Sequence, residues 1–132
     1  MVVLPSPARR LRSPGPTASE MTSQGTAHGR YTRALAQRNL AAAEIAAKEL
    51  GGLSLLDALD YLVLLAAQRP GRAQAAALRW HGRFELETST LTFVESQLAL
   101  AALASLCAGD PEAVGVLRGL LRRVRPSLVR LD

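Results

Sequence analysis

The spacing of helix-breaking residues along an alanine- and leucine-rich chain most constrains what this sequence can fold into. From about residue 30 onward, helix-favouring stretches alternate with short breaks such as Gly51-Gly52 and Pro70-Gly71. Glycine supplies the left-handed residue that ends many helices, and proline cannot continue one. Aromatic residues make up only 4% of the chain, which disfavours a sandwich of aromatic and β-branched strands. The sequence therefore predicts an all-α protein.

Capping signals divide this part of the chain into about five predicted helices. Ser54 precedes Asp57, and Thr92 precedes Glu95, in the spacing of a capping box. Asp110, which is followed by a proline, is a further signal for a helix start. The expected architecture is a compact bundle or a short array of two helical hairpins behind a leading helix. The predicted helices span about 31–50, 54–68, 72–87, 92–107 and 110–125.

The first 29 residues differ in composition from the rest. Prolines and glycines interrupt a stretch rich in serine and threonine that has no apolar period, a pattern typical of disorder. We therefore expect a disordered tail over 1–29 and one helical domain over 30–132. Because Met21 leads smoothly into the first helix, a second hypothesis places the true translation start there and treats 1–20 as a mis-assigned extension. Arginines 9, 10 and 12 follow the only short apolar run, the wrong order for a secretory signal peptide.

Two parts of the helical region resemble each other. Leu53–Asp57 matches Leu91–Glu95 at an offset of 38, and Ala77–Arg79 matches Val116–Arg118 at an offset of 39. Periods of this length are typical of helical-repeat arrays, in which one hairpin needs a stacked neighbour to bury its apolar face. The pattern predicts a helical hairpin used twice. The alternative is that two capped, leucine-rich helices look alike without a duplication.

Two predicted helices are apolar on every side over part of their length. These stretches cover 61–67 and 98–108, which is too short to span a bilayer, so we expect no membrane association. A helix that is apolar all round must be covered on all sides, and a domain of about 100 residues has few helices to do this. The leading prediction is a non-enzymatic protein–protein interaction module that forms a homo-oligomer or binds an unidentified protein partner.

Nucleic-acid binding is the first alternative. The formal net charge is +5, and Arg118, Arg122, Arg125 and Arg130 could neutralise backbone phosphates along one side of the last helix. Two observations weaken this interpretation. Only Lys48 among the sixteen basic residues is a lysine, a skew that a high-GC genome would produce by codon supply. Cations in the last turn also stabilise a helix without any ligand.

A small ligand-binding or enzymatic bundle is the second alternative. The segment 79–85 holds Trp80, the only tryptophan, and His81, one of two histidines. His81 could act as a general acid or base if a carboxylate oriented it. The candidate carboxylates are Asp57, Asp60 and Glu95. The competing interpretation places Trp80 in the core with His81 at its edge, and we therefore predict that the protein is not an enzyme.

The single cysteine bears on compartment and cofactors. Cys107 has no second cysteine for an intramolecular disulfide, which favours a cytoplasmic location. It is most simply a small apolar side chain near the end of a helix. Since no His, Cys, Asp or Glu spacing matches a metal site, we expect neither a metal nor another cofactor.

Three segments carry a resemblance to known sequences. Leu53–Leu59, Arg79–Arg83 and Glu95–Leu100 resemble a group of small uncharacterised all-helical proteins from high-GC bacteria, over about 31–125. No activity is attached to that group. The resemblance therefore implies a helical fold and assigns no functional residues.

Overall fold

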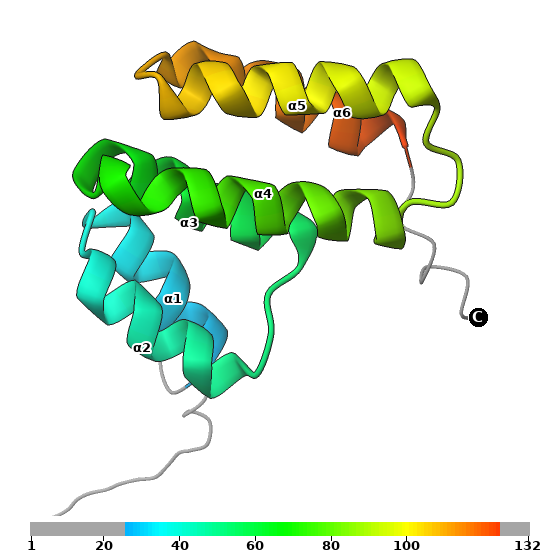
Figure 1. The fold of residues 1–132 in the computed structure, drawn as a ribbon. Coiled ribbons are helices and arrows are strands. Elements are labelled where there is room, and N and C mark those ends of the chain that lie inside the picture. Colours follow the sequence, from blue (N-terminus) through cyan, green and yellow to red (C-terminus); the bar gives the residue numbers. More distant parts are fainter. Residues whose placement is uncertain (1–25, 125–132) are drawn as a thin grey trace, which may run out of the picture. The chain divides into compact units, whose positions relative to one another are not determined.

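The computed structural model describes residues 26–124, and this part of the chain is almost entirely helical (Figure 1). Its secondary structure confirms the predicted all-α class. None of the described helices is long and apolar enough to cross a membrane. The elements, in chain order, are α1 (Ala27–Ala36), α2 (Leu40–Leu50), α3 (Leu55–Gln68), α4 (Pro70–Glu87), α5 (Phe93–Cys107), the short 3₁₀ helix η3 (Pro111–Ala113) and α6 (Val114–Arg123).

The predicted capping residues begin the helices as expected. The Ser54 hydroxyl accepts a hydrogen bond from the Asp57 amide at 3.0 Å, which starts α3. At the start of α5 both halves of the capping box form: the Thr92 hydroxyl accepts from the Glu95 amide at 3.1 Å, and the Glu95 carboxylate accepts from the Thr92 amide at 2.9 Å. These bonds satisfy amides that have no partner within the helix.

The prediction of one continuous helix over 31–50 is wrong, because a short turn separates α1 from α2. Arg38 adopts a left-handed conformation with φ of 56°. Asn39 then caps α2, its side chain accepting from the Ala42 amide at 3.1 Å. The first helix also starts earlier than predicted, at Ala27, after Thr26 as its N-cap. The turn lets α1 and α2 fold back on each other as a hairpin.

The chain divides into two compact units, with the boundary between Gly52 and Leu53. The sequence predicts a single domain over 30–132 and no boundary at this position. In the first unit, α1 packs against α2. An ion pair between Arg30 and Glu49 joins the start of α1 to the end of α2. The buried apolar side chains of this unit are those of Tyr31, Ala34, Leu40, Ala43 and Ala46.

The described part of the second unit consists of two helical hairpins, one stacked on the other (Figure 1). The α3–α4 hairpin packs through α4 on α5, and α5 pairs with η3 and α6 to form the second hairpin. Both α4 and α5 bury alanine side chains as well as larger residues. A common origin of the two hairpins stays a prediction. The largest fully buried side chains of this unit are Leu59, Leu62, Leu65, Phe84, Leu103 and Leu117.

The capping box of α5 predicts a specific pH dependence. The backbone hydrogen bond from Thr92, assisted by Arg123, holds the pKa of Glu95 below its ordinary value of 4.5. A carboxyl with a lowered folded-state pKa stabilises the protein above its unfolded pKa, and this stability is lost as the pH falls through the folded pKa. Glu95→Gln keeps the capping geometry but removes the charge. We therefore expect the wild type to exceed this variant in free energy of unfolding at pH 7.

Urea unfolding at a series of pH values measures this difference directly. It should be largest near neutral pH and should fall toward zero in acid, as the Glu95 carboxylate becomes protonated. A difference that stays constant from pH 7 into the acid range would contradict an electrostatic role for Glu95.

Candidate functional site

Trp80 is a core side chain that ties two helices of the second unit together. Its indole is only 3% exposed. The indole Nε1 donates a hydrogen bond to the Leu55 carbonyl oxygen at 2.9 Å. The ring stacks on Phe84, with centroids 5.2 Å apart and planes at 16°. Trp80 therefore anchors α4 to the start of α3 and has little surface left for a ligand.

His81 lies between α4 and α5 in a small polar cluster. Its Nε2 atom is 3.0 Å from the Ser96 carbonyl oxygen and 3.1 Å from the Ser96 hydroxyl. That hydroxyl donates to Glu85 at 2.6 Å. Since a hydroxyl has one proton and a carboxylate only accepts, Nε2 carries a proton and donates to Ser96.

This arrangement differs from a nucleophilic triad. In a triad the imidazole accepts the serine proton and the carboxylate holds the other ring nitrogen. Here the carboxylate of Glu85 accepts the hydrogen bond from the Ser96 hydroxyl, so the histidine is a donor to Ser96. The cluster joins α4 to α5. Two of the three predicted orienting carboxylates have other partners: Asp60 pairs with Arg118, and Glu95 caps α5.

The basic stripe of the last helix is partly neutralised by acidic side chains. Arg118 pairs with Asp60 at 2.6 Å, and Arg123 pairs with Glu95 at 3.1 Å. Burial raises the pKa of Asp60 and outweighs the lowering effect of Arg118. Arg122 lies beside Arg118 in a shallow cavity of about 410 Å³ whose other lining residues include leucines of α3 and α6. The predicted contacts Arg125 and Arg130 lie outside the described residues.

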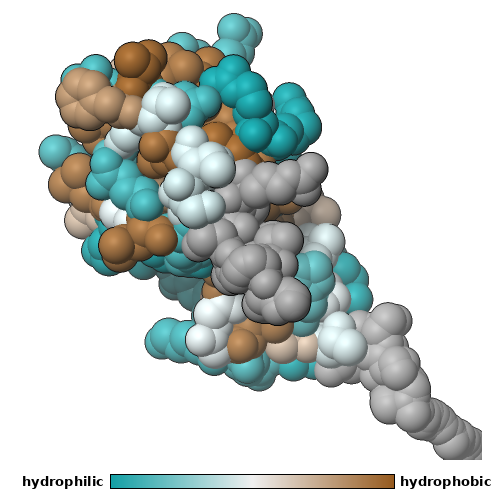
Figure 2. Space-filling view, turned by 90° about the vertical axis from the view of Figure 1, so that its right-hand side faces the viewer, coloured by the Kyte–Doolittle hydropathy of each residue, from teal (hydrophilic) through white to brown (hydrophobic). Residues whose placement is uncertain are grey.

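A stripe of exposed residues runs along α5, and we call it the α5 seam. Phe93 is 76% exposed and Leu100 is 43% exposed, although both are large apolar side chains. After Glu95, α5 carries no charged residue. The space-filling view also shows apolar side chains reaching the surface beside polar ones (Figure 2). The members of the α5 seam are Phe93, Gln97, Leu100, Ala104 and Cys107, of which Cys107 is half-buried.

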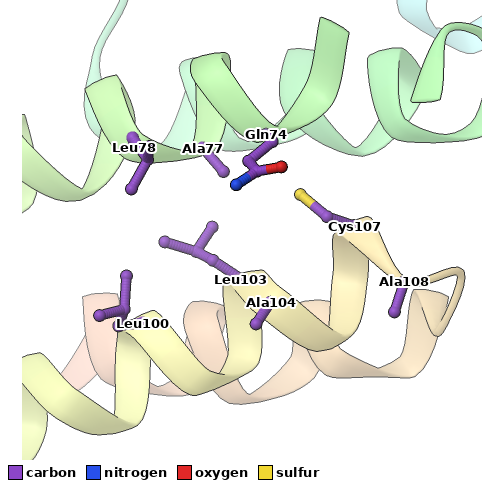
Figure 3. A pocket seen from close by; sticks show the side chains of 8 residues that line it. All are labelled: Gln74, Ala77, Leu78, Leu100, Leu103, Ala104, Cys107 and Ala108. Atoms are coloured by element: carbon purple, nitrogen blue, oxygen red, sulfur yellow. The ribbon is translucent and has the colours of Figure 1, made fainter. Parts of the chain in front are cut away.

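The C-terminal half of the α5 seam borders an open cavity between α4 and α5. Its volume is about 420 Å³, within the range of about 300–1,000 Å³ found for ligand pockets. The thiol of Cys107 is directed toward α4 (Figure 3), and burial raises the pKa of this thiol, which keeps it protonated at neutral pH. Among the residues that the structure describes, none of those lining the cavity is charged. Its lining residues are Gln74, Ala77 and Leu78 of α4, Leu100, Leu103, Ala104 and Cys107 of α5, and Ala108.

Neither a search for a metal site nor a comparison with known proteins assigns a function to any residue. In the part of the chain that the structure describes, no group of His, Cys, Asp and Glu side chains could hold a metal ion. No protein-family model, curated protein or solved structure matches this chain. The resemblance to small helical proteins of high-GC bacteria therefore stays a prediction.

Proposed function

We propose that the protein is a non-enzymatic interaction module that binds a second copy of itself through the α4–α5 face of its second unit. The observation that carries this proposal is the α5 seam beside a cavity without charged lining. Single exposed apolar side chains are common on monomers, whereas apolar side chains that gather on one surface typically mark an interaction site. Here Leu100 and Cys107 belong both to the seam and to the cavity wall.

The other predicted functions have less support. Trp80 is buried, and the His81 cluster uses its polar atoms to join two helices, which argues against an enzymatic bundle. Nucleic-acid binding needs free cations, yet Arg118, one of the predicted contacts, pairs with Asp60, and the neighbouring Arg123 pairs with Glu95. An apolar face of uncharged residues is better suited to another protein surface.

Light scattering coupled to size exclusion, across the micromolar range, tests this proposal. We expect the wild type to dimerise and Leu100→Asp to be monomeric at concentrations where the wild type is dimeric. In a symmetric dimer each copy carries the change. A loss of about 1.4 kcal/mol per copy therefore weakens the dissociation constant by about 100-fold.

Val116→Asp is the matched control, because Val116 is 42% exposed and lies on α6, where it borders Leu98 and Ala101 on another face of α5 than the seam. It introduces the same charge at a similarly exposed apolar position and should leave the dimer intact. A strictly monomeric wild type would contradict the proposal. Binding of that monomer to random duplex DNA at low salt, with release at high salt, would favour the nucleic-acid alternative instead.

A further inference from the structure

The α5 seam has the spacing of a helix-pairing surface. Its members alternate three and four residues apart, the pattern by which one helix packs along another. At 100° per residue, Phe93, Leu100 and Cys107 lie within about 40° of one another around α5. They therefore form one straight stripe, and its exposed side chains are free to meet a second helix.

The two ends of this stripe differ in size. The N-terminal end carries the exposed ring of Phe93. The C-terminal end carries the small residues Ala104, Cys107 and Ala108, which border the α4–α5 cavity. Phe93 does not line the cavity of its own chain, and Cys107, near the far end of the cavity, lies about 21 Å along the helix from it at 1.5 Å per residue. The exposed ring of Phe93 thus lies at one end of α5, and the unfilled apolar cavity lies toward the other end.

A two-fold axis would bring these two features together. In a two-fold symmetric dimer every contact occurs twice. If a first residue of one copy contacts a second residue of the other copy, the same two residues also contact each other with the copies exchanged. Phe93 and Cys107 are equally far along the chain from Leu100. Antiparallel pairing centred on Leu100 therefore places each Phe93 opposite the partner's Cys107. Parallel pairing would set Phe93 against the partner's Phe93 and leave both cavities unfilled.

We propose that two copies pair antiparallel along α5, with Phe93 of each copy inserted into the α4–α5 cavity of the other. This inference rests on the proposed self-association and adds its geometry. Leu100 packs on the partner's Leu100 at the axis. The aromatic ring supplies a large apolar area to a site lined by uncharged side chains, the kind of contact that contributes most at protein interfaces. Phe93 is therefore the principal anchor of the dimer.

A disulfide between engineered and native cysteines tests this geometry. Two cysteines can be bridged only when their Cα atoms lie within about 7 Å, so positions 93 and 107 of one chain cannot pair across about 21 Å of helix. We expect full-length Phe93→Cys, treated with oxidised glutathione, to form a covalent dimer on a non-reducing gel. Peptide mapping should identify a bond between positions 93 and 107 of different chains. The reaction is run above the dissociation constant measured for this variant.

Two control variants define the specificity of the bond. Leu98→Cys places a thiol at a residue that is 44% exposed but lies about 140° around α5 from Phe93, and it should give no covalent dimer through Cys107. Phe93→Cys combined with Cys107→Ala should lose the bond to position 107. The wild type should not cross-link through Cys107 alone, because the two thiols lie far apart in the antiparallel pair.

The outcomes separate the geometry from self-association itself. If the wild type dimerises but the Phe93→Cys variant forms no bond to position 107, the antiparallel arrangement is wrong while self-association stands. Cross-linking of the wild type through its two Cys107 thiols would lead to the same conclusion. A monomeric wild type would overturn both. As an independent measurement, Phe93→Ala should weaken the dimer at least tenfold without unfolding the chain, since this ring is mostly exposed. An unchanged dissociation constant would show that Phe93 is not the anchor.

Discussion

Replacing Trp80 with alanine is expected to lower the free energy of unfolding by about 3–5 kcal/mol, the usual cost of removing a large buried aromatic side chain. The indole is almost fully buried, stacks on Phe84 and donates to the Leu55 carbonyl. Its removal leaves a cavity between α3 and α4 and breaks the hydrogen bond to the Leu55 carbonyl. Urea unfolding followed by far-UV circular dichroism, at one fixed protein concentration, measures the loss.

Two further variants separate the contributions within this effect. Trp80→Phe retains an aromatic ring but removes the hydrogen bond to the Leu55 carbonyl, so it should cost about 0.5–1.5 kcal/mol for that bond, in addition to any change in packing. Arg79→Ala changes the exposed neighbour and should stay within about 0.5 kcal/mol of the wild type. If Trp80→Ala cost no more than Arg79→Ala, Trp80 would not be the anchor described here.

Leu117→Ala is expected to cost about 2–5 kcal/mol. Leu117 is fully buried on α6, where this helix packs against α5 and α3. The large cost follows because the surrounding helices cannot fully collapse into the space left by the side chain. Thermal and urea unfolding should both report the loss as a single shifted transition.

Val116→Ala is the control for this change, since Val116 precedes Leu117 in the same helix but is 42% exposed. It should cost less than about 1 kcal/mol. Equal effects at the two positions would indicate that α6 does not contribute to the core of the second unit.

Helix boundaries marked by glycine, proline or a capping box could be predicted from the sequence. Gly51 adopts the left-handed conformation, with φ of 76°, that ends α2, and Thr92 with Glu95 begins α5. The break between α1 and α2 contains neither glycine nor proline. The left-handed residue in this break is Arg38, and arginine is not a residue type that indicates a helix end. Asn39 is a favourable N-cap, but it indicates a helix start only when the preceding turn is already known.

The candidate site was less predictable because it depends on which helix faces meet. His81 contacts Ser96 across two helices, and only packing determines that Glu85 and Ser96 share its surroundings. The spacing of the α5 seam is present in the sequence. It is hidden there because α5 also has apolar residues on its other faces, so periodicity alone cannot tell the buried side from the exposed one.

The order in which the helices pack has a consequence for how quickly the chain can fold. Helices that follow one another in sequence also pack together: α1 with α2, α3 with α4, α4 with α5, and α5 with α6. Most closures therefore span short stretches of chain, and helical proteins with such local contacts fold in microseconds to milliseconds. Each hairpin can form soon after its second helix is synthesised, before the rest of the chain is available.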